Sequence, residues 1–135
     1  MNKDQEHLKL LVIGHYIAAA VTFVFGSFPL IHVAFGAAML GGAFDGSDKP
    51  PPPFMGWMFI GIGVTVISMF WALAAAMLTN AILLKRRKSW MLCLIIAGIE
   101  CLIMPYGTII GIFTIIILQR DSVKEIFNAK KTAAI

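Results

Sequence analysis

Glu100 is the residue whose type and position most readily suggest chemistry, because it is the only carboxylate inside an apolar segment of this sequence. In a helix that begins at Trp90, it comes about 16 Å from the helix start, near the middle of a membrane. An acidic group at that depth costs about 2.5–3.5 kcal/mol on the insertion scale. We therefore expect Glu100 to face the interior of a helix bundle, either protonated or paired.

His15 and Asn80 are the two conceivable partners of Glu100. Measured from the cytoplasmic ends of their helices, His15 lies about 10 Å deep and Asn80 about 6 Å deep. We hypothesise a buried polar cluster of these three side chains. Glu100 is then a structural hydrogen-bonding group, a proton- or cation-binding site, or a contact to another subunit.

Two histidines, His15 and His32, also suggest an axial ligand for haem or chlorophyll. On one continuous helix they are about 25 Å apart, so they cannot bind one metal ion from the same copy. Packing is the simpler role for both, and we predict no cofactor. The sequence contains no metal-binding motif, no nucleophile–base pair and no glycine-rich phosphate loop, so we predict that the protein is not an enzyme.

The composition indicates what kind of protein must position these residues. Of 135 residues, 59% are hydrophobic and 13% are charged, whereas roughly 25% of residues are charged in soluble domains. This excludes a soluble enzyme, a disordered chain and a nucleic-acid-binding protein. We predict an all-α integral membrane protein with the lipid bilayer as its first partner and a single transmembrane domain covering residues 1–135.

Four apolar segments are predicted to be membrane-spanning helices, at about residues 8–26, 54–84, 90–104 and 106–118. Residues 27–53 form an outer segment, which we expect to be an interfacial helix or an extension of the first helix, followed by a proline-rich loop. Residues 121–135 form a cytoplasmic amphipathic tail, in which Ser122 and Glu125 have the spacing of a capping box.

The distribution of Lys and Arg favours four spans over three. Four spans place ten of the eleven basic residues on one side of the membrane and leave Lys49 alone on the other, whereas three spans divide them almost evenly. By the positive-inside rule, both termini of this four-helix transmembrane bundle are cytoplasmic.

Small residues recur four positions apart in every predicted span, which would let helix backbones approach closely in lipid. We expect them to pack helices within the bundle or to join the protein to other copies or to a partner. These candidate packing residues are Gly14, Ala18, Thr22, Gly26, Ser68, Ala72, Ala76, Ala97, Gly107 and Gly111.

The last hairpin turns at Pro105, with Gly107 permitting a tight turn and Thr108 capping the next helix. From Pro105 to Leu118 the sequence reads P-x-G-T-x-x-G-I-x-T-x-x-x-L, and Phe127 follows in a short tail. This segment resembles the C-terminal hairpin of many small, functionally uncharacterised bacterial membrane proteins. The resemblance implies a helical hairpin in a bacterial cytoplasmic (inner) membrane and carries over no catalytic residue.

The function predicted from these features is that of a non-enzymatic accessory or scaffolding subunit, as a homo-oligomer or within a larger membrane complex. The alternative is a homo-oligomeric ion or proton channel or carrier that uses Glu100. A third interpretation, a haem- or pigment-binding subunit, depends on His15 or His32 alone.

Overall fold

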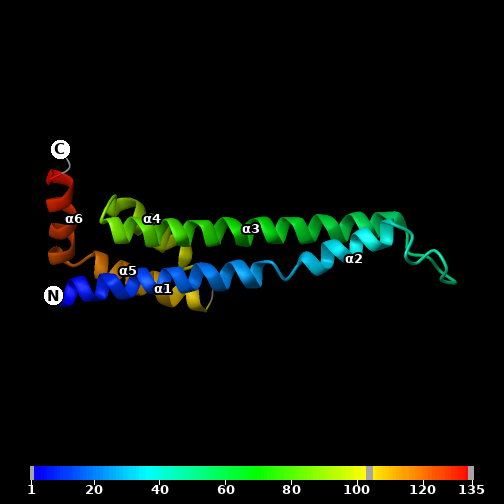
Figure 1. Ribbon diagram of the computed structural model, residues 1–135, viewed down its shortest axis with the longest axis horizontal. Helices are drawn as coiled ribbons and strands as arrows, with labels where there is room; N and C mark the ends of the chain where they lie inside the picture. The colour runs from blue at the N-terminus through cyan, green and yellow to red at the C-terminus, as the bar shows by residue number, and fades with distance from the viewer. Residues whose placement is uncertain (1, 103–104, 134–135) are drawn as a thin grey trace. The chain divides into compact units, whose positions relative to one another are not determined.

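A computed structural model describes residues 2–102 and 105–133, and every regular element in that part of the chain is an α-helix (Figure 1). The all-α prediction is therefore confirmed. The helices are α1 (Lys3–Gly26), α2 (Leu30–Leu40), α3 (Pro53–Arg86), α4 (Trp90–Glu100), α5 (Tyr106–Leu118) and α6 (Asp121–Ala133).

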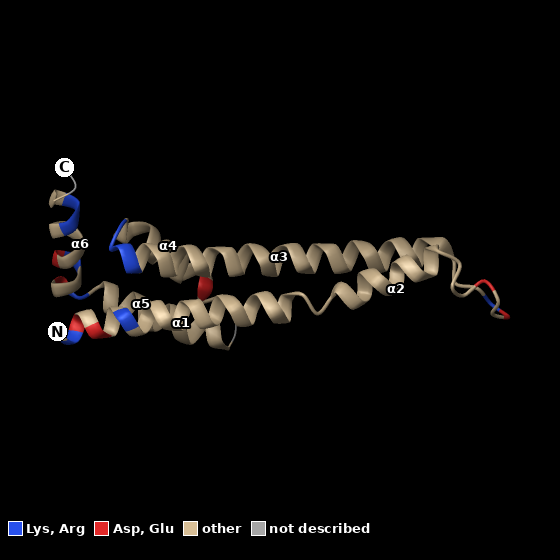
Figure 2. Cartoon of the chain, viewed as in Figure 1, with Lys and Arg blue, Asp and Glu red and all other residues tan. Residues whose placement is uncertain are grey.

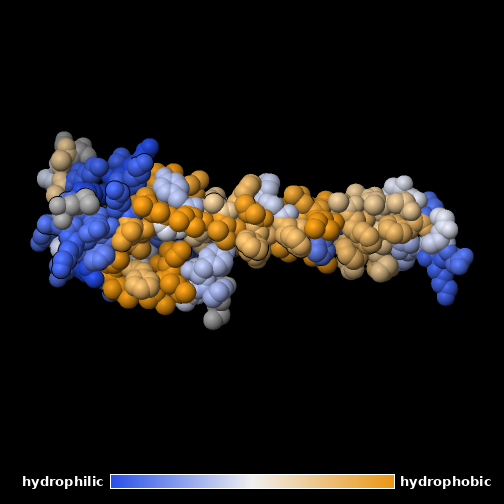
Figure 3. Space-filling model, turned by 60° about the horizontal axis from the view of Figure 1, so that its bottom comes forward, coloured by the Kyte–Doolittle hydropathy of each residue, from blue (hydrophilic) through white to orange (hydrophobic). Residues whose placement is uncertain are grey.

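In the part of the chain that the structure describes, two stretches are long and apolar enough to cross a membrane. The first is Lys3–Leu40, which combines α1 and α2, and the second is α3. The pair α5 and α6, which is bent by 75°, makes at most a third span. The surface along the helices is hydrophobic, while α6 and the neighbouring helix ends are hydrophilic (Figure 3). The chain is a membrane protein with two clear spans, and its helices fall into two compact units.

The first unit contains the chain up to Val21 and the chain from Leu73 onward. Its long helices pack through buried residues that alternate three and four positions apart, the spacing of left-handed helix pairs. In α1 these residues are Leu8, Leu11, His15 and Ala18, and in α3 they are Ala74, Met77, Ala81 and Leu84.

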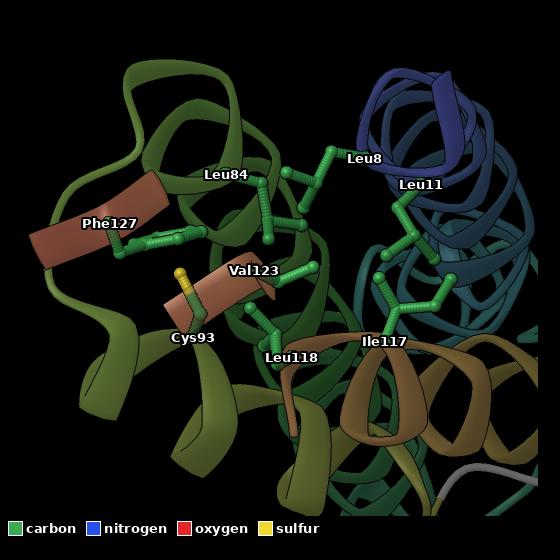
Figure 4. Close-up of a cluster of buried hydrophobic side chains, with 8 residues drawn as sticks. All are labelled: Leu8, Leu11, Leu84, Cys93, Ile117, Leu118, Val123 and Phe127. Carbon is green, nitrogen blue, oxygen red and sulfur yellow. The ribbon is translucent and has the colours of Figure 1, made fainter. Parts of the chain in front are cut away.

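The hydrophobic core of this unit joins α1, α3, α4, α5 and α6. Val123 and Phe127 of α6 are buried in it together with the last residues of α5 (Figure 4). The amphipathic tail predicted from the sequence thus folds as a helix against the bundle. The eight buried residues of this cluster are Leu8, Leu11, Leu84, Cys93, Ile117, Leu118, Val123 and Phe127.

The hairpin of α4 and α5 depends on a close backbone approach at Gly111. A Cβ atom added there would lie 2.6 Å from the carbonyl oxygen of Ala97, so only glycine fits without a shift. Thr108 does not cap α5 as expected, because Pro105 occupies the N-cap and makes no side-chain cap bond. The Thr108 hydroxyl instead donates to the Cys101 carbonyl at 2.9 Å, bracing the turn. The predicted end of the third segment, Met104, lies outside the described residues.

The N-terminus of α1 is tied to the start of α6. The Ser122 hydroxyl donates to Asp4 Oδ2 at 2.6 Å, and Arg120 Nη1 lies 3.1 Å from Asp4 Oδ1. These contacts lower the pKa of Asp4, the Ser122 hydrogen bond first and the Arg120 bond next. The capping box expected at Ser122 is therefore wrong, because α6 begins one residue earlier and the hydroxyl binds another helix.

The second unit, Thr22–Ala72, pairs the end of α1 and all of α2 with the first half of α3. A Cβ atom added to Gly36 of α2 would lie 2.6 Å from the Gly56 carbonyl oxygen in α3. Such close packing along α3 corresponds to the helix-extension alternative for this segment, not to an interfacial helix that lies apart from the spans. Near the break between α1 and α2, Trp71 donates to the Ser27 hydroxyl at 3.2 Å and stacks on Phe23.

Candidate functional site

The side chains of His15, Asn80 and Glu100 meet inside the first unit. His15 belongs to the buried face of α1, Asn80 comes from the last two turns of α3, and Glu100 ends α4. Their exposed fractions are 0%, 0% and 1%. On α4, Cys93, Ala97 and Glu100 are the buried residues, and their spacing of four and three positions turns the carboxylate toward the other helices.

His15 uses both ring nitrogens in this cluster. Nδ1 lies 2.8 Å from the Leu11 carbonyl oxygen, one turn earlier in the same helix. Since a carbonyl oxygen can only accept, Nδ1 carries a hydrogen and donates it. Nε2 then faces Glu100 Oε2 at 2.8 Å. With both nitrogens engaged, neither is free in this arrangement to be the axial ligand of a haem or chlorophyll.

A hydrogen bond between His15 Nε2 and Glu100 Oε2 requires one proton in the contact. With Nδ1 protonated, the Nε2–Oε2 contact is either an imidazolium facing a carboxylate or a neutral imidazole accepting from a carboxylic acid. Both states have zero net charge. This neutrality matters in a membrane, because an unpaired charge there is costly, and a proton transferred across the contact leaves the net charge unchanged.

Asn80 completes the cluster from α3. Its Nδ2 donates to Glu100 Oε1 at 3.4 Å and lies 3.2 Å from His15 Nε2. Its Oδ1 is buried and has no hydrogen-bond partner among the residues that the structure describes. The amide therefore joins α3 to both other helices through its nitrogen and leaves one acceptor unused.

The cluster is enclosed by side chains, since none of its three residues is more than 1% exposed. Cavities of about 430, 310 and 560 Å³ in the first unit are lined by other residues. This arrangement suits a contact that holds α1, α3 and α4 together. Within residues 2–102 and 105–133, no three His, Cys, Asp or Glu side chains are grouped to hold a metal ion.

The other candidate residues have mixed positions. His32 is exposed on α2 and stacks on Phe59 with ring centroids 6.1 Å apart. Six of the small packing residues are buried: Ala18, Thr22, Gly26, Ala97, Gly107 and Gly111. Gly14 and Ala76 are half-buried, and Ser68 and Ala72 are exposed, so of the two expected roles the exposed pair fits the contact with another copy or a partner.

Sequence reasoning missed a regular row of small residues on the exposed face of α3, which we name the small-residue stripe. Its residues are alternately four and three positions apart, on the face opposite the buried residues of α3. Reading the sequence for that alternation, instead of for steps of four, would have found it. The stripe consists of Gly61, Thr65, Ser68 and Ala72 in the second unit, all exposed.

Comparison with known proteins adds no relative: no family model, no curated protein and no solved structure matches this chain.

Proposed function

We propose that the protein is a non-enzymatic accessory or scaffolding subunit of a membrane, which packs against a helix of another membrane protein or of a second copy. The small-residue stripe of α3 is the observation that carries this proposal. In lipid, helices associate through close backbone approach and not through the hydrophobic effect. A row of small side chains on an exposed helix face permits that approach.

The polar members of the stripe are compatible with a membrane-embedded contact. The hydroxyls of Thr65 and Ser68 each donate to the carbonyl four residues earlier, at 2.8 Å. These hydroxyls are therefore satisfied without water, as lipid requires. Exposed bulky side chains flank the stripe, Met58 and Met69 on one side and Val64 and Trp71 on the other, so a partner helix would contact the stripe between these two rows.

The buried cluster supports this function because it holds the short hairpin of α4 and α5 against the longer helices α1 and α3. α4 has 11 residues and α5 has 13, which is about 16 and 20 Å of helix, short of the hydrocarbon core of about 30 Å. A hairpin of that length is held in place by contacts with longer helices. Glu100, bonded to His15 and Asn80, provides a contact with both.

In this proposal both termini face the cytoplasm of a bacterial cell. The charge distribution supports that orientation, since Lys and Arg gather at the ends of α1 and α3 and on α6, and Lys49 lies in the loop between α2 and α3 (Figure 2). The short hairpin enters and leaves on the cytoplasmic side as a re-entrant element. A hairpin that crosses fully, as in a four-span bundle, gives the termini the same orientation.

A photo-crosslinking amino acid at position 72, on the stripe, tests the packing role. A matched control carries it at position 78, since Leu78 is exposed but off the stripe. We expect one discrete protein adduct from position 72 and none from position 78, and native mass spectrometry should show the same complex. Ala72→Leu should dissociate it, while Ala20→Leu, at an exposed alanine of α1, should not. A monomeric protein, or equal adducts from both positions, would overturn the proposal.

A second candidate function, a proton-coupled channel or carrier, is favoured by the one-proton contact between His15 and Glu100. Its test is proton flux into proteoliposomes that contain the full chain. This function would be established by a proton flux that is abolished in the Glu100→Gln variant and unchanged in the Glu6→Gln variant. Absence of flux from the wild-type protein would exclude a proton-coupled function. The role of the cluster would then be to hold the α4–α5 hairpin against α1 and α3.

A further inference from the structure

A cavity of about 560 Å³ lies in the first unit where the loop after α3, the start of α4 and the end of α6 come together. Four cationic side chains line it, Arg87 and Lys88 from the loop and Lys130 and Lys131 from α6. The rest of its lining includes the apolar side chains of Trp90 and Phe127. The cavity thus combines a cationic rim with an apolar floor.

Among residues 2–102 and 105–133, no carboxylate forms an ion pair with any of the four cations. In the described part of the chain, the ion pairs of Arg120 and Lys124 use Asp4 and Asp121, and none joins a carboxylate to the cavity cations. Like charges that converge on one cavity repel one another, and an anion placed among them removes that repulsion. The cavity is therefore electrostatically complementary to an anionic group.

The fold holds these cations in position. Burial of Val123 and Phe127 fixes α6 at 75° to α5, and Trp90 Nε1 donates to the Leu118 carbonyl at 2.7 Å. Arg87 and Ser89 have φ angles of 51° and 54°, a left-handed backbone that non-glycine residues seldom adopt. The side chain of Ser89 makes no cap bond to α4, so the unpaired N–H groups of its first turn add to the positive potential.

We propose that this cavity binds the headgroup of an anionic phospholipid. The phosphate lies among Arg87, Lys88, Lys130 and Lys131, and the glycerol and upper acyl carbons contact Trp90. A lipid fits better than a free phosphate ion because of the apolar floor, and because α4 continues directly into exposed apolar residues, Met91 and Leu92, along which an acyl chain can run. This inference does not depend on the proposed function.

The test is lipid retention by the full-length protein in native mass spectrometry, with phosphatidylglycerol or phosphatidylcholine added at equal concentration. Lys130→Gln with Lys131→Gln removes two cations of the rim, and both side chains are exposed, so the fold should persist. The matched control is Lys3→Gln with Lys49→Gln, which removes two exposed cations that do not line the cavity.

We expect the wild-type protein to retain one phosphatidylglycerol in preference to phosphatidylcholine. The cavity variant should lose that retention on the order of tenfold, and the control should keep it. Equal loss in both double variants would show general surface attraction and overturn the proposal, as would unchanged retention in the cavity variant. Complete displacement of the lipid by inorganic phosphate would also overturn it, because the apolar floor would then contribute nothing.

Discussion

At the scale of single residues, His15 shows how one side chain can connect three helices. Its ring binds the backbone of α1 through Nδ1 and reaches α4 and α3 through Nε2. Sequence alone leads to this cluster because a lone acid in an apolar helix must find polar partners, and few polar residues lie at a similar depth. Sequence does not reveal which atoms meet, since the rotation of each helix about its axis depends on packing.

Removing the carboxylate should weaken the fold more than neutralising it. Glu100→Ala removes both hydrogen bonds of the carboxylate, those to His15 Nε2 and Asn80 Nδ2, so we expect a loss of about 1–3 kcal/mol in the free energy of unfolding. Glu100→Gln, which keeps a hydrogen-bonding group, should cost less than half of that. Denaturant unfolding in detergent checks both, and Glu6→Ala, at an exposed acid, is the control. Equal losses in the Ala and Gln variants would contradict the hydrogen-bonded cluster.

Asp4, which precedes the apolar part of α1, gives a prediction for acid pH. Because its pKa is lowered below 3.8 by Ser122 and Arg120, the folded state favours the carboxylate. The resulting stability is fully present above pH 3.8 and is lost as the pH falls through the lower, folded-state pKa. Ser122→Ala should raise the Asp4 pKa toward 3.8, as followed by NMR titration of the carboxyl carbon. An unchanged pKa would mean that the contact does not persist in solution.

At the scale of elements, the helix boundaries were predictable and the packing faces were not. Each apolar run ends at charges, proline or glycine, and the observed helices end near those residues. The steps of four read from the sequence include Ser68 and Ala72 beside buried residues of other helices, and both are exposed. A row with steps of four drifts around the helix by about 40° at each step, so it cannot follow one neighbour for long. Alternating steps of three and four stay on one face.

The α4–α5 hairpin should tolerate a methyl group at one glycine and not at another. A Cβ atom at Gly111 meets Ala97 O and Cys101 Sγ at 2.6 Å, whereas one at Gly98 meets nothing within 4 Å. We expect Gly111→Ala to destabilise the protein by about 1–3 kcal/mol. Gly98→Ala should be neutral or stabilise by up to about 1 kcal/mol, because alanine favours helix. Thermal unfolding followed by circular dichroism measures both, and similar shifts would refute close packing at Gly111.

At the scale of the whole molecule, membrane orientation can be measured with cysteines introduced after Cys93 and Cys101 have been replaced by alanine. A membrane-impermeant thiol reagent should label Ser47→Cys in intact cells, and Asn128→Cys only after permeabilisation. Pro105→Cys distinguishes the two hairpin topologies. A re-entrant hairpin keeps that thiol unreactive from outside, whereas a four-span bundle exposes it. Labelling of Asn128→Cys in intact cells would reverse the proposed orientation.

The sequence separation within the buried cluster also fixes an order of events during biosynthesis. Glu100 follows His15 by 85 residues, so the imidazole leaves the ribosome and enters the membrane well before its acidic partner has been translated. Until the carboxylate arrives, the ring nitrogen Nε2 lacks its acidic partner and can bond to Asn80 of α3, which is translated earlier. The late insertion of the short hairpin is therefore the step that completes the native structure, and a nascent chain truncated before that hairpin would be a natural substrate for membrane quality control.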